Sequence, residues 1–219
     1  MTDDGCTVIG AGGHGKVVLA TLQAAGVRVA ECWDDDPRLH GSELLGVPVR
    51  GPIAARSEAH PGHPAVLAVG DNRVRRQLVG SLSLEWRTAV HPRAWVHESV
   101  TLGEGTVVFA GAVIQPDARL GRHAIVNTGA TVDHDCRLGD FVHLAPGVHL
   151  AASVTVEEGA LLGVGSAVIP GRSVGAWATV GAGAVVLEEV PPGATVVGVP
   201  ARRLAADHGS DSLLRNREP

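Results

Sequence analysis

The chain has 219 residues and a formal net charge of −5 at pH 7, with charged residues making up 19% of it. This balance argues against a nucleic-acid backbone as a partner, because phosphate contacts depend on Lys and Arg. No apolar run approaches the roughly eighteen residues that span a bilayer, and the first residues do not form a basic region followed by an apolar one. We therefore expect neither membrane insertion nor a secretory signal peptide.

The first thirty-odd residues predict a βαβ unit. Its expected elements are a strand at 6–9, a glycine-rich turn at 10–15, a helix at 16–25 and a strand at 27–33. Glycines allow the backbone to approach a ligand phosphate, and the N-terminus of the helix favours its charge. Asp34 and Asp35, about twenty positions after the turn, can accept hydrogen bonds from a sugar or a base. The simpler alternative is a βαβ unit that only needs a tight turn.

A second buried strand is predicted at 65–69, followed by a turn and another helix. Asp71 or Asn72 can cap that helix. Gly70 lies at the carboxyl end of the strand, where open α/β sheets bind their ligands. Three arginines follow, at positions 73, 75 and 76, and are expected on a solvated helix face. We interpret residues 1–90 as a Rossmann-like domain.

Residues 96–186 repeat with a period of six. Sixteen positions six residues apart, from Val96 to Val186, all hold Val, Leu or Ile. Four positions after each of the first fifteen comes a small or β-branched residue, except at Arg172. Neither a helix nor a plain strand produces this period, which is typical of a parallel β-helix with three hexapeptides in each coil. The anchors predict about five coils. We expect this domain to cover residues 91–204 and residues 205–219 to form a frayed tail.

Two hexapeptides carry polar residues where the others carry glycine or small residues. They contain Asn127 and, a few positions later, His134 followed by Asp135; His143 comes nine residues after His134. An imidazole titrates near neutral pH and a carboxylate can hold its tautomer, so the pair suits general-base chemistry. Neighbours on a strand point to opposite faces, so their contact requires a turn. The alternative is that these are exposed turn residues on a polar outer wall.

The histidines and cysteines raise the question of a metal. His123, His134, His143 and His149 all lie in the predicted β-helix, and a zinc ion shared between subunits would need three histidines. No pair is spaced for one metal, so we expect no metal site. Cys6, Cys32 and Cys136 lack metal or disulfide spacing, and predict reduced core residues in a cytoplasmic protein.

Several motifs together carry a resemblance to a known family. They are Gly10–Lys16, Asp34–Pro37, Asn127–Thr128, Asp133–Cys136 and Gly198–Ala201. They resemble the sugar acyltransferases of the sialic-acid O-acetyltransferase type, and within these the nucleotide-sugar N-acetyltransferases acting on 4-amino sugars in bacillosamine and perosamine synthesis. The likeness covers nearly the whole chain. It implies a left-handed β-helix, a homotrimer, acetyl-CoA as acyl donor and a nucleotide-linked amino sugar as acceptor.

The resemblance also implies roles for individual residues. The nucleotide sugar would be cradled by Gly12, Gly13 and His14, with Lys16 near phosphate, Asp34 and Asp35 at the nucleoside, Gly70 closing the pocket and Asn127 positioning the substrate. His134 would be the general base and Asp135 its partner. The acetyl-CoA thioester would lie by His143, and the pantetheine arm would pass Val164, Gly165 and Ala182 between subunits.

Other functions stay open on the sequence. O-acetylation of sialic acid or another sugar can use the same base as N-acetylation. A trimeric scaffold without catalysis is a second alternative, against which both His134 and the glycine turn argue. An NAD-dependent enzyme is a third, although the first domain looks short for a full dinucleotide fold. The sequence does not identify the nucleotide, the sugar or the pathway.

Overall fold

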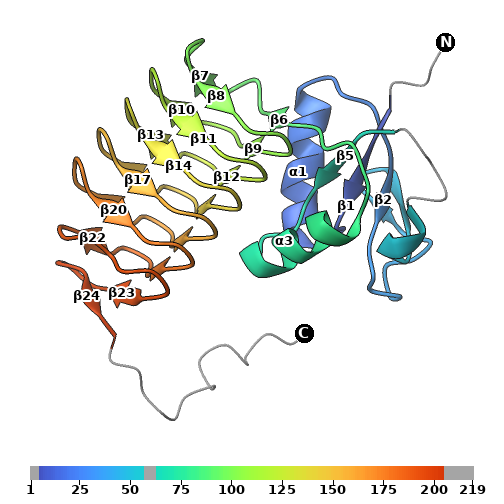
Figure 1. Cartoon of the computed structure of the whole chain (residues 1–219). Coiled ribbons are helices and arrows are strands. Elements are labelled where there is room, and N and C mark those ends of the chain that lie inside the picture. The colour runs from blue at the N-terminus through green and yellow to red at the C-terminus, as the bar shows by residue number, and fades with distance from the viewer. Residues whose placement is uncertain (1–4, 57–62, 205–219) are drawn as a thin grey trace.

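The computed structural model describes residues 5–56 and 63–204, so the predicted tail at 205–219 lies outside the described residues. An α/β domain packs against the side of a parallel β-helix (Figure 1). This order of folds confirms the predicted class. In the described part of the chain, no helix is both long and apolar enough to cross a bilayer.

The N-terminal domain is built on a five-stranded sheet in the order β3-β4-β2-β1-β5. The strands are β1 Cys6–Ile9, β2 Val29–Trp33, β3 Glu43–Leu44, β4 Val47–Arg50 and β5 Ala65–Leu67. β1 pairs in parallel with β2 and β5, while β3 and β4 form an antiparallel hairpin. The predicted strands at 6–9, 27–33 and 65–69 are thus present, with β2 and β5 two residues shorter than expected.

Among the described residues, helices α1 Gly13–Ala24 and α3 Asn72–Ser81 flank this sheet, and a 3-10 turn covers Ile53–Ala55. Helix α1 begins inside the glycine turn, three residues earlier than predicted. Helix α3 is capped by Asp71, whose carboxylate accepts the backbone N–H groups of Arg73 and Val74 at 2.8 and 2.9 Å. This cap satisfies N–H groups that the first turn of a helix leaves without partners.

The β-helix has three parallel sheets, and each strand residue between positions 89 and 168 pairs with the residue eighteen positions later, as in Val113 with Thr131. One sheet, called sheet C here, contains β6 Ala89–Val90, β9 Val107–Val108, β12 Ile125–Val126, β15 His143–Leu144, β18 Leu161–Leu162, β21 Thr179–Val180 and β23 Thr195–Val197, with β24 Arg202–Arg203 added antiparallel. Sheet D contains β7 Trp95–Val96, β10 Val113–Ile114, β13 Thr131–Val132, β16 His149–Leu150, β19 Ala167–Val168 and β22 Val185–Val186. Sheet E contains β8 Thr101–Leu102, β11 Arg119–Leu120, β14 Arg137–Leu138, β17 Thr155–Val156 and β20 Ser173–Val174.

The six-residue period predicted which side chains form the core of the β-helix. The second residue of each two-residue strand points inward, and the resulting core contains Ile114, Val132 and Leu150 with almost no exposed surface. Between the strands, small inward residues such as Ala130 and Cys136 complete each layer. The stacking starts before Val96 and continues past Val186, because β6 and β23 also pair with the coils beside them.

The corners of the β-helix turn through residues in the left-handed region. Each corner is named here by the two sheets that it joins in chain order, so corner C/D leads from sheet C to sheet D. Among the described coils, the left-handed residues of corner C/D are all glycine. Corner D/E instead holds Asp117, Asp135, Ser153 and Gly171, and corner E/C holds Gly105, His123, Phe141, Gly159 and Trp177. Their φ values lie between +53° and +71°. Asp tolerates this region better than most residues, but the aromatic side chains do not favour it. At corner E/C, stacking between rings of neighbouring coils offsets this cost. His123 lies parallel to Phe141, with ring centroids 5.5 Å apart.

The N-terminal domain covers the outer face of sheet C. Val107, Phe109 and Ile125 point out of the β-helix and are at most 1% exposed, because they pack with Val18 and Leu22 of α1. This apolar seam fixes the two domains against each other and places the glycine turn beside the early coils. Burial of such side chains contributes about 25 cal/mol per Å² of apolar surface.

Helix α3 joins the two domains through hydrogen bonds to main-chain carbonyls of the β-helix. Asn72 donates from Nδ2 to the carbonyls of Gly159 and Ala160 at 3.0 and 3.2 Å. Arg75 is only 1% exposed and donates to the carbonyls of His123 and Phe141 at 3.0 and 2.7 Å. The prediction that all three arginines of this helix lie on a solvated face was therefore wrong for Arg75. A helical pattern does not reveal a second domain that packs over the helix.

Gly105→Ala is expected to lower the free energy of unfolding by about 1–3 kcal/mol more than Gly193→Ala. A Cβ on Gly105 would overlap the ring of buried His123, whereas open space surrounds the same atom on Gly193. Both glycines have a φ of +68°, so both variants bear the same conformational cost. Urea unfolding measures the difference, and equal losses in the two variants would contradict the packing argument.

Candidate active site

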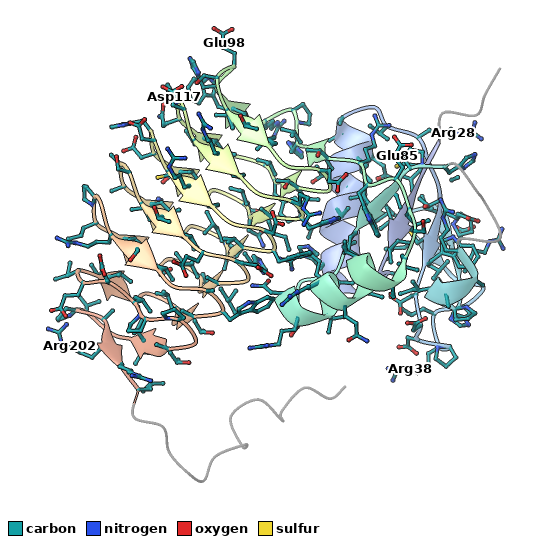
Figure 2. All side chains as sticks on the ribbon, in the orientation of Figure 1. Arg28, Arg38, Glu85, Glu98, Asp117 and Arg202 are labelled. Atoms are coloured by element: carbon teal, nitrogen blue, oxygen red, sulfur yellow. The ribbon has the colours of Figure 1, made fainter. Side chains whose placement is uncertain are left out.

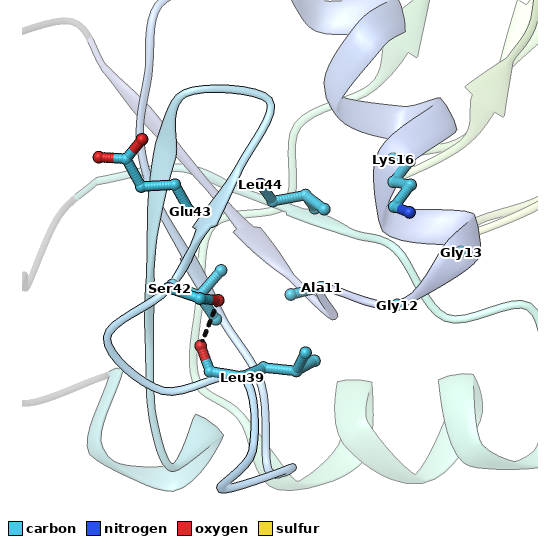
Figure 3. Close-up of a pocket in the computed structure, with 9 residues that line it drawn as sticks. Ala11, Gly12, Gly13, Lys16, Leu39, Ser42, Glu43 and Leu44 are labelled. Atoms are coloured by element: carbon cyan, nitrogen blue, oxygen red, sulfur yellow. Dashed lines mark hydrogen bonds between the residues drawn. The ribbon is translucent and has the colours of Figure 1, made fainter. Parts of the chain in front are cut away.

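The glycine turn opens onto a pocket of about 320 Å³. It is lined by Ala11, Gly12, Gly13, Lys16, Leu39, Ser42, Glu43, Leu44 and Val49. Leu44 of the β3–β4 hairpin extends across it toward the side where Lys16 stands on α1 (Figure 3). No Cβ blocks the entrance at Gly12 or Gly13, around which space is open. A phosphate here would meet the N-terminus of α1 and the Lys16 ammonium, so the pocket suits an anionic ligand.

The two aspartates predicted to contact a nucleoside hold the backbone beside this pocket. Asp34 accepts the N–H of Ala11 at 2.6 Å and the N–H of Asp36 at 2.9 Å, so both of its oxygens are engaged. Asp35 accepts the N–H of Ile53 at 2.8 Å through Oδ1. They therefore shape the glycine turn and the loop after β4. Direct contact of either carboxylate with a nucleoside stays a prediction.

A second group of polar residues lies where the glycine turn meets sheet C. Nδ1 of His143 lies 3.1 Å from the carbonyl oxygen of Gly70, and its Nε2 lies 3.4 Å from Nδ2 of Asn127. The ring of His14 lies 6.1 Å from that of His143, and its buried Nε2 has no partner. The structure thus brings together four predicted substrate and cofactor residues from both domains.

The two histidines of this group are neutral at physiological pH. Burial lowers the pKa of His143 to about 4, with further contributions from the positive charge of Arg75 and from His14. Burial and then Arg75 lower the pKa of His14 to about 4 as well. The Gly70 carbonyl only accepts, so the neutral His143 ring carries its hydrogen on Nδ1 and accepts from Asn127 at Nε2.

His134 and Asp135 form a contact at corner D/E. Asp135 has a φ of +61°, and this turn places its Oδ2 2.7 Å from Nδ1 of His134. The turn therefore overcomes the alternation that would separate neighbours on a strand. Both side chains are more than half exposed, and the hydrogen bond to Asp135 raises the pKa of His134. Nδ1–H donates to the carboxylate when the ring is neutral, which leaves Nε2 free to accept a proton.

The β-helix separates this pair from the pocket of its own chain. His134 and Asp135 follow β13 and precede β14, so they lie where sheets D and E meet, opposite sheet C. Asp117, one coil earlier at the same corner, projects on the side away from the N-terminal domain (Figure 2). Asn127 and His143 belong to the coils of sheet C that face that domain. One chain by itself does not bring His134 to the pocket.

The left-handed positions of corner C/D form a strip of glycines along the β-helix. They are Gly111, Gly129, Gly147, Gly165 and Gly183. The other corners accept Asp, Ser, His, Phe and Trp at similar φ values, so the backbone alone does not require glycine here. A Cβ on Gly129, Gly165 or Gly183 would meet nothing within 4 Å. Val164 beside this strip is 55% exposed, and Ala182 is also exposed. The strip leaves room for an extended chain or a neighbouring backbone.

Residues 5–56 and 63–204 contain no group of three or more His, Cys, Asp or Glu that could hold a metal ion. Cys136 is buried and its Sγ donates to the carbonyl of Ala151 at 3.2 Å. Burial raises the pKa of this thiol to about 11. The side chain therefore stays protonated inside the core and is poorly suited to act as a nucleophile.

Two residues at the site were missed from the sequence. Phe109 lies edge-on to His14, with ring centroids 5.4 Å apart. Arg75 donates from Nη1 to the carbonyls of Val69 and Gly70 at 3.2 and 3.1 Å. Phe109 could have been noticed as one of only two Phe residues, at an outward position of the repeat. Arg75 carries no such signal, since Arg73 and Arg76 flank it on the same helix.

Comparison with known proteins gives matches over the whole described fold. Residues 6–82 match the family described as the PglD N-terminal domain. Among solved structures, a variant of GDP-perosamine N-acetyltransferase from Caulobacter crescentus, in complex with CoA and GDP-perosamine, is 44% identical. The match covers 92% of this chain and 97% of that one, with a TM-score of 0.86.

Two further relatives support the same likeness. The acetyltransferase domain of PglB from Neisseria gonorrhoeae FA1090, in complex with acetyl coenzyme A, is 40% identical with a TM-score of 0.87. That match covers 92% of this chain and 99% of that one. UDP-N-acetylbacillosamine N-acetyltransferase from Bacillus subtilis is 43% identical over 112 residues, which are 47% of this chain. The chain spans about half the length of this curated relative, 50%.

Proposed function

The chain belongs to the left-handed β-helix acetyltransferases that act on nucleotide-linked amino sugars, and from this premise we propose that it transfers an acetyl group from acetyl-CoA to the amine of such a sugar. A 4-amino sugar is the preferred acceptor in this proposal. The observation that carries the proposal is the His134–Asp135 pair, whose Nε2 is free to accept a proton, in a chain whose N-terminal domain holds a pocket suited to an anion. A cytoplasmic location stays a prediction.

His134 is proposed as the general base. As the amine nitrogen of the sugar bonds to the carbonyl carbon of the thioester, Nε2 of His134 takes a proton from that amine. When the C–S bond breaks, Nε2 gives this proton to the departing CoA sulfur. Asp135 holds the Nδ1–H tautomer and stabilises the imidazolium that forms. Transfer is direct, since the buried Cys136 thiol is no nucleophile. Most of the rate comes from holding amine and thioester together.

Completion of the site needs a second copy of the chain, and we propose a homotrimer packed through sheet D. The outer positions of sheet D are Trp95, Val113, Thr131, His149, Ala167 and Val185. Those of sheet E are Thr101, Arg119, Arg137, Thr155 and Ser173, which are more polar. Packing around a threefold axis through the less polar sheet places corner D/E of one copy near corner C/D of the next. His134 then approaches the Asn127 and His143 of its neighbour.

The glycine strip of corner C/D is the proposed path of the pantetheine arm. An extended chain with amide groups can lie along backbone that carries no Cβ, and Val164 offers an exposed apolar contact beside it. Gly165 and Ala182 line the same corner in neighbouring coils. On this path the thioester end reaches the level of His143. The nucleotide would occupy the pocket at Gly12, Gly13 and Lys16, with the sugar directed toward His14 and Asn127.

A panel of acceptors tests the proposed function. UDP-, GDP- and dTDP-linked amino sugars are incubated with acetyl-CoA, together with sialic acid as the competing O-acetyl acceptor. We expect acetylation of at least one nucleotide-linked 4-amino sugar, detected as a gain of one acetyl group by mass spectrometry and as an equal amount of free CoA thiol. Acetylation of sialic acid alone would replace this function by O-acetyl transfer.

A further inference from the structure

A single buried cation connects the domain interface to the proposed acetyl-transfer site. The guanidinium of Arg75 donates four hydrogen bonds, and all four acceptors are main-chain carbonyl oxygens. Two belong to His123 and Phe141 at corner E/C of the β-helix, and two to Val69 and Gly70 after β5. Burial lowers the pKa of Arg75 to about 10, so the group stays charged at neutral pH. An arginine fork can hold several acceptors in a fixed geometry.

The Gly70 carbonyl is shared between this cation and a residue of the site. It accepts from Nη1 of Arg75 at 3.1 Å and lies 3.1 Å from Nδ1 of His143. The peptide unit of Gly70 has no side chain to hold it in place. Arg75 therefore fixes the orientation of the carbonyl, and the carbonyl fixes which nitrogen of His143 carries the hydrogen.

The charge of Arg75 lowers the pKa of His143, whereas the hydrogen bond to the Gly70 carbonyl raises it. The titratable and charged groups that act on the His143 ring are Arg75 from α3 and His14 from α1. Asn127 on the other side of the ring is uncharged. Burial of the ring, followed by the positive charge of Arg75, outweighs the hydrogen bond to Gly70, so the neutral ring is favoured.

We propose that Arg75 is a positioning residue for acetyl transfer. Arg75 holds His143 as the Nδ1–H tautomer, so that Nε2 of His143 accepts a hydrogen bond from Asn127. This hydrogen bond orients the Asn127 side chain toward the substrate. The proposal rests on the proposed function for its role in catalysis. Its structural part, the tautomer of His143 and its dependence on Arg75, can be measured without any substrate. The sequence gives no sign of it, because Arg75 lies between Arg73 and Arg76 on the same helix.

The test compares Arg75→Met and Arg75→Lys with Arg76→Met. Arg76 lies on the same helix, but its guanidinium stacks on Trp177 at the surface and pairs with Glu158. Nitrogen-15 spectra of the histidine rings report the tautomer and the pKa of His143. In the unaltered protein we expect an Nδ1–H ring that stays neutral well below pH 6. In Arg75→Met we expect a higher pKa for His143 and a mixture of tautomers. Arg76→Met should match the unaltered protein.

Kinetics separate positioning from a general loss of stability. Arg75→Met is expected to lower kcat by on the order of 10- to 100-fold at pH 7.5 per folded molecule, because a misplaced group near the chemistry costs rate. KM for the nucleotide sugar should change far less, since the pocket at Gly12 and Lys16 is untouched. The acid limb of kcat follows His134, whose pKa is the higher of the two, so it should stay in place. Arg75→Lys keeps the charge without the fork, so we expect an intermediate kcat and a His143 pKa close to the original.

Several results would overturn the proposal. An Nε2–H tautomer or an ordinary pKa for His143 in the unaltered protein would do so even if Arg75→Met fails to fold. A folded Arg75→Met with an unchanged kcat, an unchanged His143 tautomer and lowered stability alone would leave Arg75 a purely structural residue. If the spectra agree but no acceptor is acetylated, the proposed function fails and the tautomer assignment stands.

Discussion

Replacing His134 with Ala is expected to lower kcat by about 10²- to 10⁴-fold, the usual contribution of a general base. The side chain is more than half exposed and contacts mainly its neighbour Asp135, so the variant should keep its fold and oligomeric state. KM for the nucleotide sugar should change little, because the pocket at Gly12, Gly13 and Lys16 lies on the other side of the β-helix. Steady-state kinetics and sedimentation measure these quantities. Near-normal turnover would remove His134 from the mechanism.

Asp135→Asn is the matched variant for the pH profile. The hydrogen bond to Asp135 raises the pKa of His134, and a base must be neutral to accept a proton. Activity should therefore rise with pH through the pKa of His134. Without the carboxylate that pKa falls, so the acid limb of kcat should move to lower pH while the maximal rate declines. An acid limb that does not move would argue against the pair acting as a unit.

The location of His134 at corner D/E, away from the pocket of its own chain, allows a second test of its proposed role. His134→Ala lacks the proposed general base and Asn127→Ala lacks the residue proposed to position the substrate, so each alone should be impaired, but in a mixed trimer the intact residues of different copies meet. Random assembly of equal amounts should restore about a quarter of the sites. Co-expression with two affinity tags isolates such mixtures. No recovery would contradict a site shared between copies.

The second large effect is a loss of stability between pH 6.5 and pH 4. The pKa values of His14, His123 and His143 are each lowered to about 4, in every case first by burial. In the unfolded chain a histidine titrates near 6.5. As pH falls below that value the unfolded state takes up protons that the native state refuses, so the free energy of unfolding declines until about pH 4. Each group contributes about 3 kcal/mol at most. Urea unfolding across this range measures the slope.

His123→Phe isolates one of these contributions. Both ring nitrogens of His123 are buried without a hydrogen-bond partner, and the ring stacks on Phe141 and meets Trp86 edge-on. A phenyl ring keeps the stacking, and the corner already accepts Phe141 at a φ of +60°. The variant should lose about a third of the pH dependence and become more stable than the original at pH 5. His97→Gln, in a surface turn, is the control. An unchanged slope in His123→Phe would contradict the assignment.

The sequence alone determined the β-helix and its inward residues, because a period of six leaves one solution for burying Val132 and its fifteen counterparts. It also located the glycine turn, the cap at Asp71 and the polar hexapeptides, since each depends on neighbours in the chain. Whether His134 meets Asp135 was open, because the answer depends on the left-handed φ of Asp135 and not on the alternation of a strand.

Only the tertiary structure decided what lies between the domains and what lies far apart. The burial of Arg75 depends on carbonyls of His123 and Phe141, 48 and 66 residues away, and no local pattern encodes such contacts. The structure likewise joins His143 to Gly70 across 73 residues, and it separates His134 from both. The physical reason is the same in each case. Periodicity reports which side of an element is apolar, whereas the partner of a polar group is set by how whole elements pack.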